Sequence, residues 1–362
     1  MYQDKFKLGL VLSGGGAKGA YEVGVVKALA KLGLEPRVVS GASIGAVNGA
    51  IVASCTDMEK AAFELDLIWR GIDAESIIKT RIKSERIVML ASLHMVVSNV
   101  FKMNPVSFFS SIAASPFLRS LVTDDDLKVL SILDRSPLEN ILRNTVNFSD
   151  LNLPGARDFH VSLFPAGMSE SPQIIKPIVD YICSSEESEF KVVNGRPPDD
   201  ILDLIMASAA IPIAFEPVKV DGKWYYDGGM GDRVKVQGNT PIRPLLDSNC
   251  THAIVVMLGN GTLWDRSEWS EITTIEVRPS ENMGSIFDIF DFSPTRIAEL
   301  IDLGYRDAVR SIGKVYDATS RFRSLAETNK KLHKTVTDTK KFDIEYDSVI
   351  KHFHYSTNKK LY

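Results

Sequence analysis

Three features are scarce in this sequence, and each absence excludes a class of protein. Cysteine occurs only three times in 362 residues, far apart and without a CxxC pair, so neither a disulfide framework nor a zinc site is indicated. The formal charges nearly balance at a net −4, which gives no overall attraction to nucleic acid or to anionic lipid. No uncharged apolar run reaches the roughly 18 to 20 residues of a membrane-spanning helix.

The beginning of the sequence also lacks the features of a signal peptide. Residues 1–7 lead directly into a strand pattern, without an apolar core or a small-residue cleavage site. With 44% hydrophobic and 24% charged residues, the composition is that of an ordinary globular enzyme. We therefore expect a cytoplasmic protein in a reducing setting. No group of Asp, Glu, His or Cys has the spacing of metal ligands, so neither a metal nor another cofactor is expected.

The most informative motif is Gly-x-Ser-x-Gly, with Ser43 between Gly41 and Gly45. An apolar strand pattern precedes it and a small-residue helix pattern follows, which is typical of a nucleophile turn. Glycine is needed on both sides because a Cβ atom there would collide with the neighbouring strand and helix. The unpaired N–H groups at the start of the helix favour alkoxide and oxyanion character. Ser43 is therefore a candidate nucleophile.

A glycine-rich loop, residues 14–19, comes before this motif. It follows an apolar strand pattern at residues 8–12 and precedes a helix pattern, and a second strand at 37–40 then leads to Ser43. Two parallel strands with a helical crossover predict a βαβ unit. Because both loops leave the carboxyl edge of the sheet, we expect residues 14–19 and Ser43 to lie side by side.

One interpretation of this loop is dinucleotide binding. Gly14, Gly16 and Gly19 match Gly-x-G-x-x-G, and Glu35 lies near the spacing of a ribose-binding acid. A phosphate-binding P-loop is excluded, because Ala20 stands where that motif requires lysine.

A second interpretation of the loop is an oxyanion hole. The bare N–H groups of Gly14, Gly15 and Gly16, with Gly19 closing the loop, could approach a developing alkoxide, and Lys18 adds a cation nearby. A plain tight turn is the third interpretation, since glycine is the usual turn residue.

A tract with few charges follows. Residues 87–101 carry no charged side chain, and neither do residues 103–118. One interpretation is a helical insertion, at about 76–150, that packs on the core over the active-site face. The other is an apolar lid that opens onto lipid or lines an acyl-chain groove.

The rest of the chain predicts mixed helices and strands. Helices are expected at 57–70, 136–142, 199–210 and 294–312, strands at 159–164, 174–179, 190–193, 253–258 and 273–277, and a hairpin at 219–226. The hairpin ends at Asp227, and an aspartate before two glycines is ordinarily a turn residue. The tail 320–362 has an excess of basic residues, which indicates a solvated tail or contact with anionic membrane.

Together, four motifs in order resemble the patatin-like phospholipase family of lipid acyl hydrolases. They are the segments 14–19, 41–45, 207–217 and 227–229. The resemblance covers about residues 6–258. It implies that Ser43 is the nucleophile, that Asp227, supported by Gly228 and Gly229, is its partner in a Ser–Asp dyad, and that N–H groups of the glycine loop form the oxyanion hole.

The implied dyad agrees with the absence of a suitably placed histidine. A Ser–His–Asp enzyme of the α/β-hydrolase fold needs a histidine late in the chain, after the acid. The candidates are His252, His333, His352 and His354, and none follows a strand in a glycine-supported loop. Asp227 would then take the proton of Ser43 directly, and a site of low polarity should raise its pKa from the usual value near 4.

The sequence departs from the family pattern at one place. Relatives commonly have Asn-x-Pro soon after Asp-Gly-Gly, whereas residues 230–238 intervene here before Asn239-Thr240-Pro241. We expect the extra loop to form part of the substrate rim or a regulatory surface.

The expected fold is α/β: a mostly parallel sheet sandwiched by helices, patatin-like, with a helical insertion. We expect one domain over residues 1–362, with a core at about 6–260 and a C-terminal helical extension at 285–362.

The expected function is hydrolysis of fatty-acyl esters of membrane glycerophospholipids at the membrane surface. A small-molecule or protein activator, such as a nucleotide second messenger in bacterial defence, and self-association are open alternatives; a nucleic acid polymer is not an expected partner. The competing hypothesis is a non-hydrolytic dinucleotide-binding module that uses Gly14 to Gly19.

Overall fold

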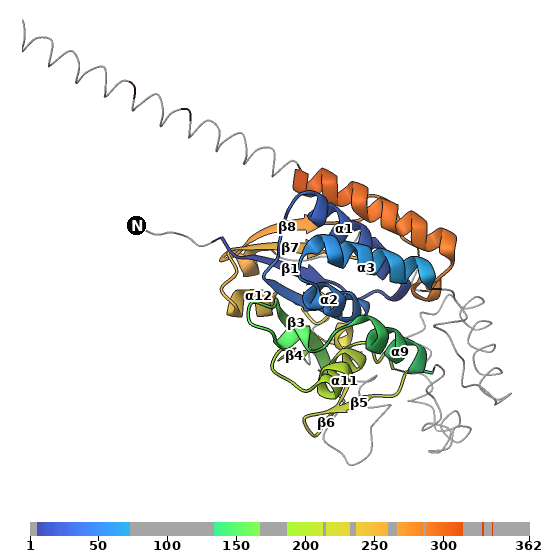
Figure 1. Cartoon of the computed structure of the whole chain (residues 1–362). Helices are drawn as coiled ribbons and strands as arrows, with labels where there is room; N and C mark the ends of the chain where they lie inside the picture. The colour runs from blue at the N-terminus through green and yellow to red at the C-terminus, as the bar shows by residue number, and fades with distance from the viewer. Residues whose placement is uncertain are drawn as a thin grey trace, which may run out of the picture. The chain divides into compact units, whose positions relative to one another are not determined.

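The computed structural model of the chain describes most of the sequence (Figure 1). The described residues are 6–72, 134–166, 187–212, 215–231, 237–259, 266–284, 287–313, 328 and 335. The apolar tract 87–118 and the expected strand 174–179 lie outside them. The chain divides into two compact units, Met1–Ser311 and Ile312–Tyr362, and the sheet and the candidate site discussed below belong to the first. The domain boundaries expected from the sequence stay a prediction.

One mixed sheet forms the centre of the first unit. Its strand order is β5-β6-β3-β2-β1-β7-β8, and β4 pairs with β3. The strands are β1 (Leu8–Leu12), β2 (Val38–Gly41), β3 (Asp158–Pro165), β4 (Glu189–Val192), β5 (Val218–Val220), β6 (Lys223–Asp227), β7 (His252–Val256) and β8 (Thr273–Val277). The strands from β3 to β8 along this order pair in parallel, whereas β4, β6 and β5 pair antiparallel.

Helices cover both faces of the sheet, as the sequence of β1 requires. Successive strand residues point to opposite faces, and both Leu10 and Val11 are fully buried. The described helices are α1 (Ala20–Lys31), α2 (Ile44–Ser54), α3 (Met58–Gly71), α9 (Ser136–Thr145), α11 (Pro198–Ser208), α12 (Arg243–Asp247) and a helix over 294–313. Continuous apolar strands such as LGLVL suit a parallel sheet buried on two sides.

Contacts between elements place the functional part of the molecule. Helix α1 packs against α3, and α2 packs on β2 and β3. On the other face, Leu245 of α12 belongs to a buried cluster with Val11 and Val255. The predicted α/β fold with a mostly parallel sheet is confirmed. The described helices and strands that the sequence predicted agree to within a few residues, and α12 was not predicted.

Candidate active site

The turn that carries Ser43 connects the end of β2 to the start of α2. Ser43 has φ 54° and ψ −126°, a conformation that costs a residue with a side chain roughly 1–3 kcal/mol. A Cβ atom on Gly41 would collide with the carbonyl of Gly45, and one on Gly45 would collide with the carbonyl of Leu12. The two glycines therefore allow the tight reversal that holds Ser43 in this strained conformation.

The backbone of Ser43 is fixed by a hydroxyl that the sequence did not single out. Its N–H donates to Ser208 Oγ at 3.0 Å, and Ser208 Oγ donates to the carbonyl of Ser162 at 2.8 Å. Ser208 is fully buried at the end of α11. The sequence contained one signal for this role. Ser208 stands among alanines at the end of a predicted helix, and a hydroxyl buried there needs a hydrogen-bond partner.

The register of the sheet brings Asp227 to the level of Ser43. Strand β3 runs parallel to β2, with Gly41 opposite Val161, and continues past it. Strand β6 pairs antiparallel with this continuation, with Asp227 opposite Leu163. Two positions further along the two parallel strands, Ser43 follows Gly41 and Leu163 follows Val161. Because Asp227 lies opposite Leu163, the end of β6 lies at the level of the serine turn.

The carboxyl group of Asp227 is buried, with 5% of the residue exposed. Oδ1 accepts a hydrogen bond from the Gly229 N–H at 2.8 Å, and Oδ2 is buried with no partner of its own among the described residues. Burial raises the pKa of Asp227 to about 6, while the Ser43 side chain and the hydrogen bond from the Gly229 N–H partly oppose this rise. The site thus contains a hydroxyl beside a carboxylate of increased basicity.

The glycine loop lies directly beside the serine. A Cβ atom on Gly14 would lie 3.0 Å from Ser43 Cβ. The loop ends in a short 3-10 helix, η1 (Gly16–Gly19), and Gly16 has φ 57°. Among the described residues, the N–H groups of Gly15 and Gly16 donate to no protein acceptor, whereas the Gly14 N–H donates to the carbonyl of Asn239 at 3.2 Å. Of the three glycines expected to stabilise an oxyanion, Gly15 and Gly16 therefore have available donors.

The amine of Lys18 bonds to a backbone carbonyl in a distant segment of the chain. Its Nζ donates to the carbonyl of Gly284 at 3.2 Å. Burial lowers the pKa of Lys18, with Asp288 raising it and Arg296 lowering it. In this geometry Lys18 links the glycine loop to the segment before residue 294.

The Asn-x-Pro motif reaches the site in spite of the nine residues that separate it from the Asp-Gly-Gly motif. Asn239 Nδ2 donates to the carbonyl of Gly14 at 3.3 Å, which completes a pair of hydrogen bonds between the two residues. Thr240 and Ser13 share a hydrogen bond at 2.9 Å, and Ser40 donates to the carbonyl of Pro241. Asn239 and Thr240 therefore support the start of the glycine loop.

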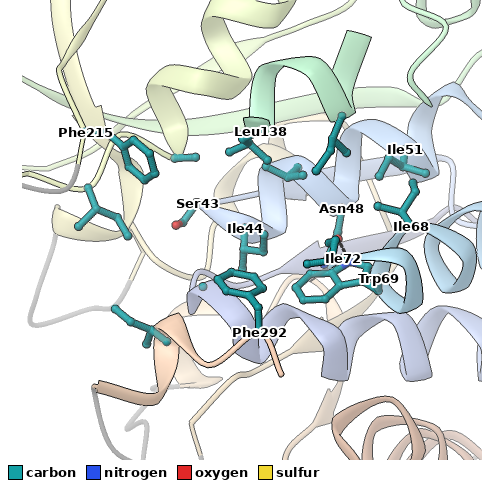
Figure 2. Close-up of a pocket in the computed structure, with 16 residues that line it drawn as sticks. Ser43, Ile44, Asn48, Ile51, Ile68, Trp69, Ile72, Leu138, Phe215 and Phe292 are labelled. Carbon is teal, nitrogen blue, oxygen red and sulfur yellow. Dashed lines mark hydrogen bonds between the residues drawn. The ribbon is translucent and has the colours of Figure 1, made fainter. Parts of the chain in front are cut away.

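An apolar pocket opens beside Ser43 (Figure 2). One face of α2 lines it, with side chains from α3, α9 and the segments near 211 and 290 opposite. The lining consists of Gly16, Ser43, Ile44, Val47, Asn48, Ile51, Ile68, Trp69, Ile72, Leu138, Ile141, Ala209, Ile211, Phe215, Ile289 and Phe292. Almost all of these side chains are aliphatic or aromatic, so the pocket suits a hydrocarbon chain better than a polar ligand.

The residue that a dinucleotide would need is engaged elsewhere. Glu35 Oε1 accepts the Met58 N–H at 3.0 Å, and Oε2 pairs with the guanidinium of Arg157. Both carboxylate oxygens already have protein partners, so ribose binding by Glu35 would have to displace them.

Within the described ranges, no group of three or more His, Cys, Asp or Glu side chains could hold a metal ion. None of the helices in that part of the chain is long and apolar enough to cross a membrane.

The comparison with family models identifies the family to which the chain belongs. A family model described as patatin-like phospholipase matches residues 10–246. This match spans well over half of the sequence, so the chain belongs to the patatin-like phospholipase family. The resemblance drawn from the four motifs is confirmed.

Individual relatives match over shorter segments. The chain is 43% identical over 70 residues to lysophospholipase nte1 of Aspergillus terreus, which covers 17% of this chain and 5% of that protein. It is 48% identical over 50 residues to a patatin-like phospholipase domain-containing protein of Caenorhabditis elegans, covering 14% and 4%. The chain therefore matches only about one twentieth of the length of these relatives.

Among solved structures, the chain is similar to VipD from Legionella pneumophila. The TM-score is 0.45 at 15% identity, covering 86% of this chain and 67% of that one.

Proposed function

We propose that this chain is a serine acyl hydrolase that cleaves fatty-acyl esters of membrane glycerophospholipids through Ser43 and Asp227. One observation carries the proposal: a buried aspartate, whose pKa is raised by burial and lowered in part by the Ser43 side chain, belongs to the same site as a strained serine that lines an apolar pocket. Perturbed carboxyl groups in such a cleft are typical of general bases. Membership of a phospholipase family supports the same chemistry.

The proposed reaction has two steps. Asp227 takes the proton of the Ser43 hydroxyl as its oxygen attacks the ester carbonyl, and the resulting oxyanion accepts hydrogen bonds from the Gly15 and Gly16 N–H groups. The leaving alcohol takes the proton back from Asp227 and leaves an acyl-enzyme. Asp227 then activates a water molecule, which releases the fatty acid. A pKa of about 6 keeps Asp227 mostly ionised at pH 7 and makes it a stronger base than a free aspartate.

The pocket supplies the binding energy for the acyl chain. Each buried methylene group contributes about 0.8 kcal/mol, so even part of a fatty-acyl chain would be held firmly. In Figure 2, Ser43 lies between Phe215 on one side and Ile44 and Asn48 on the other, and Ile44 and Asn48 follow it along α2. A chain bound along α2 would place its carboxyl end at the serine.

The test uses phosphatidylcholine vesicles and a fluorophosphonate probe. Ser43→Ala and Asp227→Asn should each reduce fatty-acid release by at least about 10³-fold, since each removes a group that acts in the chemical step. Ser54→Ala is the matched control on the same helix, because, among the residues that the structure describes, its hydroxyl bonds only to the Ile51 carbonyl within that helix. Probe labelling should require Ser43. Wild-type activity in either variant, with correct folding, contradicts the proposal.

We further propose that the enzyme acts at the membrane surface and is gated by an activator. Support comes from the sequence alone, namely the apolar tract 87–118 and the loop 230–238. Vesicle hydrolysis with and without added cell extract or nucleotide second messengers tests this point. A full rate from purified protein, unchanged by any addition, rejects gating without affecting the hydrolase proposal.

A further inference from the structure

A second buried carboxyl group lies near the active site, and the proposed reaction does not use it. Glu22 is in the first turn of α1, three residues after Gly19, and its side chain is fully buried. Its Oε2 accepts a hydrogen bond from Asn48 Nδ2 at 2.8 Å. Burial raises the pKa of Glu22 to about 8, so this group is mostly uncharged at neutral pH. A buried acid without a salt bridge is costly and needs an explanation.

Asn48 connects this acid to three other elements. It lies on α2, five residues after Ser43, and its Nδ2 also donates to the carbonyl of Gly19 at 3.1 Å. Its Oδ1 accepts a hydrogen bond from Trp69 Nε1 at 2.9 Å (Figure 2). One amide therefore joins the end of the glycine loop, the helix that follows the serine, and α3.

The other end of the glycine loop affects the pKa of the same carboxyl group, whose Oε1 has no hydrogen-bond partner among the described residues. The Ser13 N–H interacts with Glu22 and, together with Asn48, lowers the pKa of this acid against the effect of burial. Ser13 directly follows β1, and Gly19 directly precedes α1, so these two residues are the ends of the loop. Asn48 thus bonds both to Glu22 and to the Gly19 end of the loop beside Ser43, and the pKa of Glu22 responds to the Ser13 end.

We propose that Glu22 and Asn48 are positioning residues. They hold the glycine loop in the position from which the Gly15 and Gly16 N–H groups can donate hydrogen bonds to the oxyanion. The physical reason is preorganisation: donors that are already aimed at the developing charge need no rearrangement during the reaction. A loop held only by its glycines would sample many conformations, because glycine has the greatest backbone freedom. The kinetic consequence rests on the proposed function, but the effect on loop order does not.

Glu22 is the better residue to vary, because Asn48 also lines the pocket and Glu22 does not. Removing the carboxyl in Glu22→Ala should lower kcat by about 10- to 100-fold with KM changed less than about threefold, as expected for loss of oxyanion preorganisation. Glu22→Gln keeps a carbonyl oxygen for Asn48 and should recover kcat to within about fivefold of wild type.

The second readout is hydrogen exchange of peptides that cover residues 13–20 in the full chain. Exchange of these amides should become at least about tenfold faster in Glu22→Ala and stay near wild type in Glu22→Gln. The matched control is Tyr21→Phe, which removes a buried hydrogen bond from the adjacent residue to Asp307. This change should leave loop exchange and kcat unaltered.

Three outcomes overturn the proposal: a wild-type kcat and exchange rate in folded Glu22→Ala, an equal loss in Tyr21→Phe, or no recovery in Glu22→Gln. If Glu22→Ala does not fold, Glu22→Asp is the variant to use, because it shortens the side chain by one methylene. It should also lower kcat and speed up exchange of residues 13–20, and unchanged values of both overturn the proposal. If the wild-type protein hydrolyses no ester, the proposed function fails while the exchange data still decide the role of Glu22.

Discussion

The two parts of the sheet contribute to the candidate site in different ways. In the parallel part, the glycine loop follows β1 and the Ser43 turn follows β2, so both groups lie just beyond the carboxyl ends of neighbouring strands. In the antiparallel part, Asp227 arrives from the opposite direction and meets Ser43 only because β3 extends past β2.

This difference shows where the geometry is sensitive. The parallel part is fixed locally, since a short strand, a tight turn and a helix suffice to present the serine. The position of Asp227 depends on the pairing of two strands that are about sixty residues apart in sequence, and a shift by one residue would turn its side chain to the other face. Changes at the antiparallel part should therefore affect activity before they affect folding.

Among variants of residues that support the site, the largest expected effect comes from Gly228→Ala. A Cβ atom at Gly228 would collide with the backbone carbonyl of Ser162, so β3 and the end of β6 must separate. Because Asp227 is the preceding residue, we expect fatty-acid release to fall by at least about 100-fold. Gly71→Ala is the control, since its Cβ would meet no atom within 4 Å. Equal activity of the two variants would show that Asp227 does not need this close approach.

A smaller effect is expected from Ser208→Ala, which disconnects the two parts. The Ser208 hydroxyl accepts from the Ser43 N–H and donates to the Ser162 carbonyl, so it joins the serine turn to β3. Leaving these buried groups unpaired costs about 1–3 kcal/mol. We expect kcat to fall by about tenfold, measured with a soluble ester. A loss of thermal stability with wild-type kcat would assign Ser208 to folding alone.

The smallest expected effect is on the pH dependence of folding stability. It compares one buried acid from the parallel part, Glu22, with one from the antiparallel part, Asp227. Asp227 and Glu22 both have raised pKa values, about 6 and about 8, because of burial. In the unfolded chain both acids ionise near pH 4, so the folded state loses stability as the pH rises from about 4 through these values.

The melting temperature should therefore fall between pH 5 and pH 8. In Glu22→Gln this fall should be smaller by about 5 °C, and in Asp227→Asn by less, because the pKa of Glu22 lies further from its usual value. Scanning calorimetry at the two pH values measures both differences. An identical slope in wild type and Glu22→Gln would mean that Glu22 is ionised in the folded protein.

The sequence predicted the parallel part of the site better than the antiparallel part, for a physical reason. The strand, glycine loop and Gly-x-Ser-x-Gly turn are local patterns, and their proximity follows from the shared edge of a parallel sheet. Asp227 has no such local signal, and only the family resemblance pointed to it.

The supporting residues were missed because their partners lie far away in sequence. Ser208 bonds to Ser43 over 165 positions, and Asn239 bonds to Gly14 over 225 positions. Glu22 did carry a signal, since an acid stands between buried apolar residues near the start of α1. Its meaning depends on Asn48, which no spacing rule connects to it.

Asn48 has a consequence for attempts to redesign the enzyme. Its amide bonds to Gly19 in the glycine loop and to Trp69 in the pocket wall, so the same side chain belongs to both. Enlarging the pocket at Trp69 to admit a bulkier acyl chain would also remove a support of the loop. If the chain is the proposed acyl hydrolase, substrate range and turnover are therefore coupled, and selection for one will be constrained by the other.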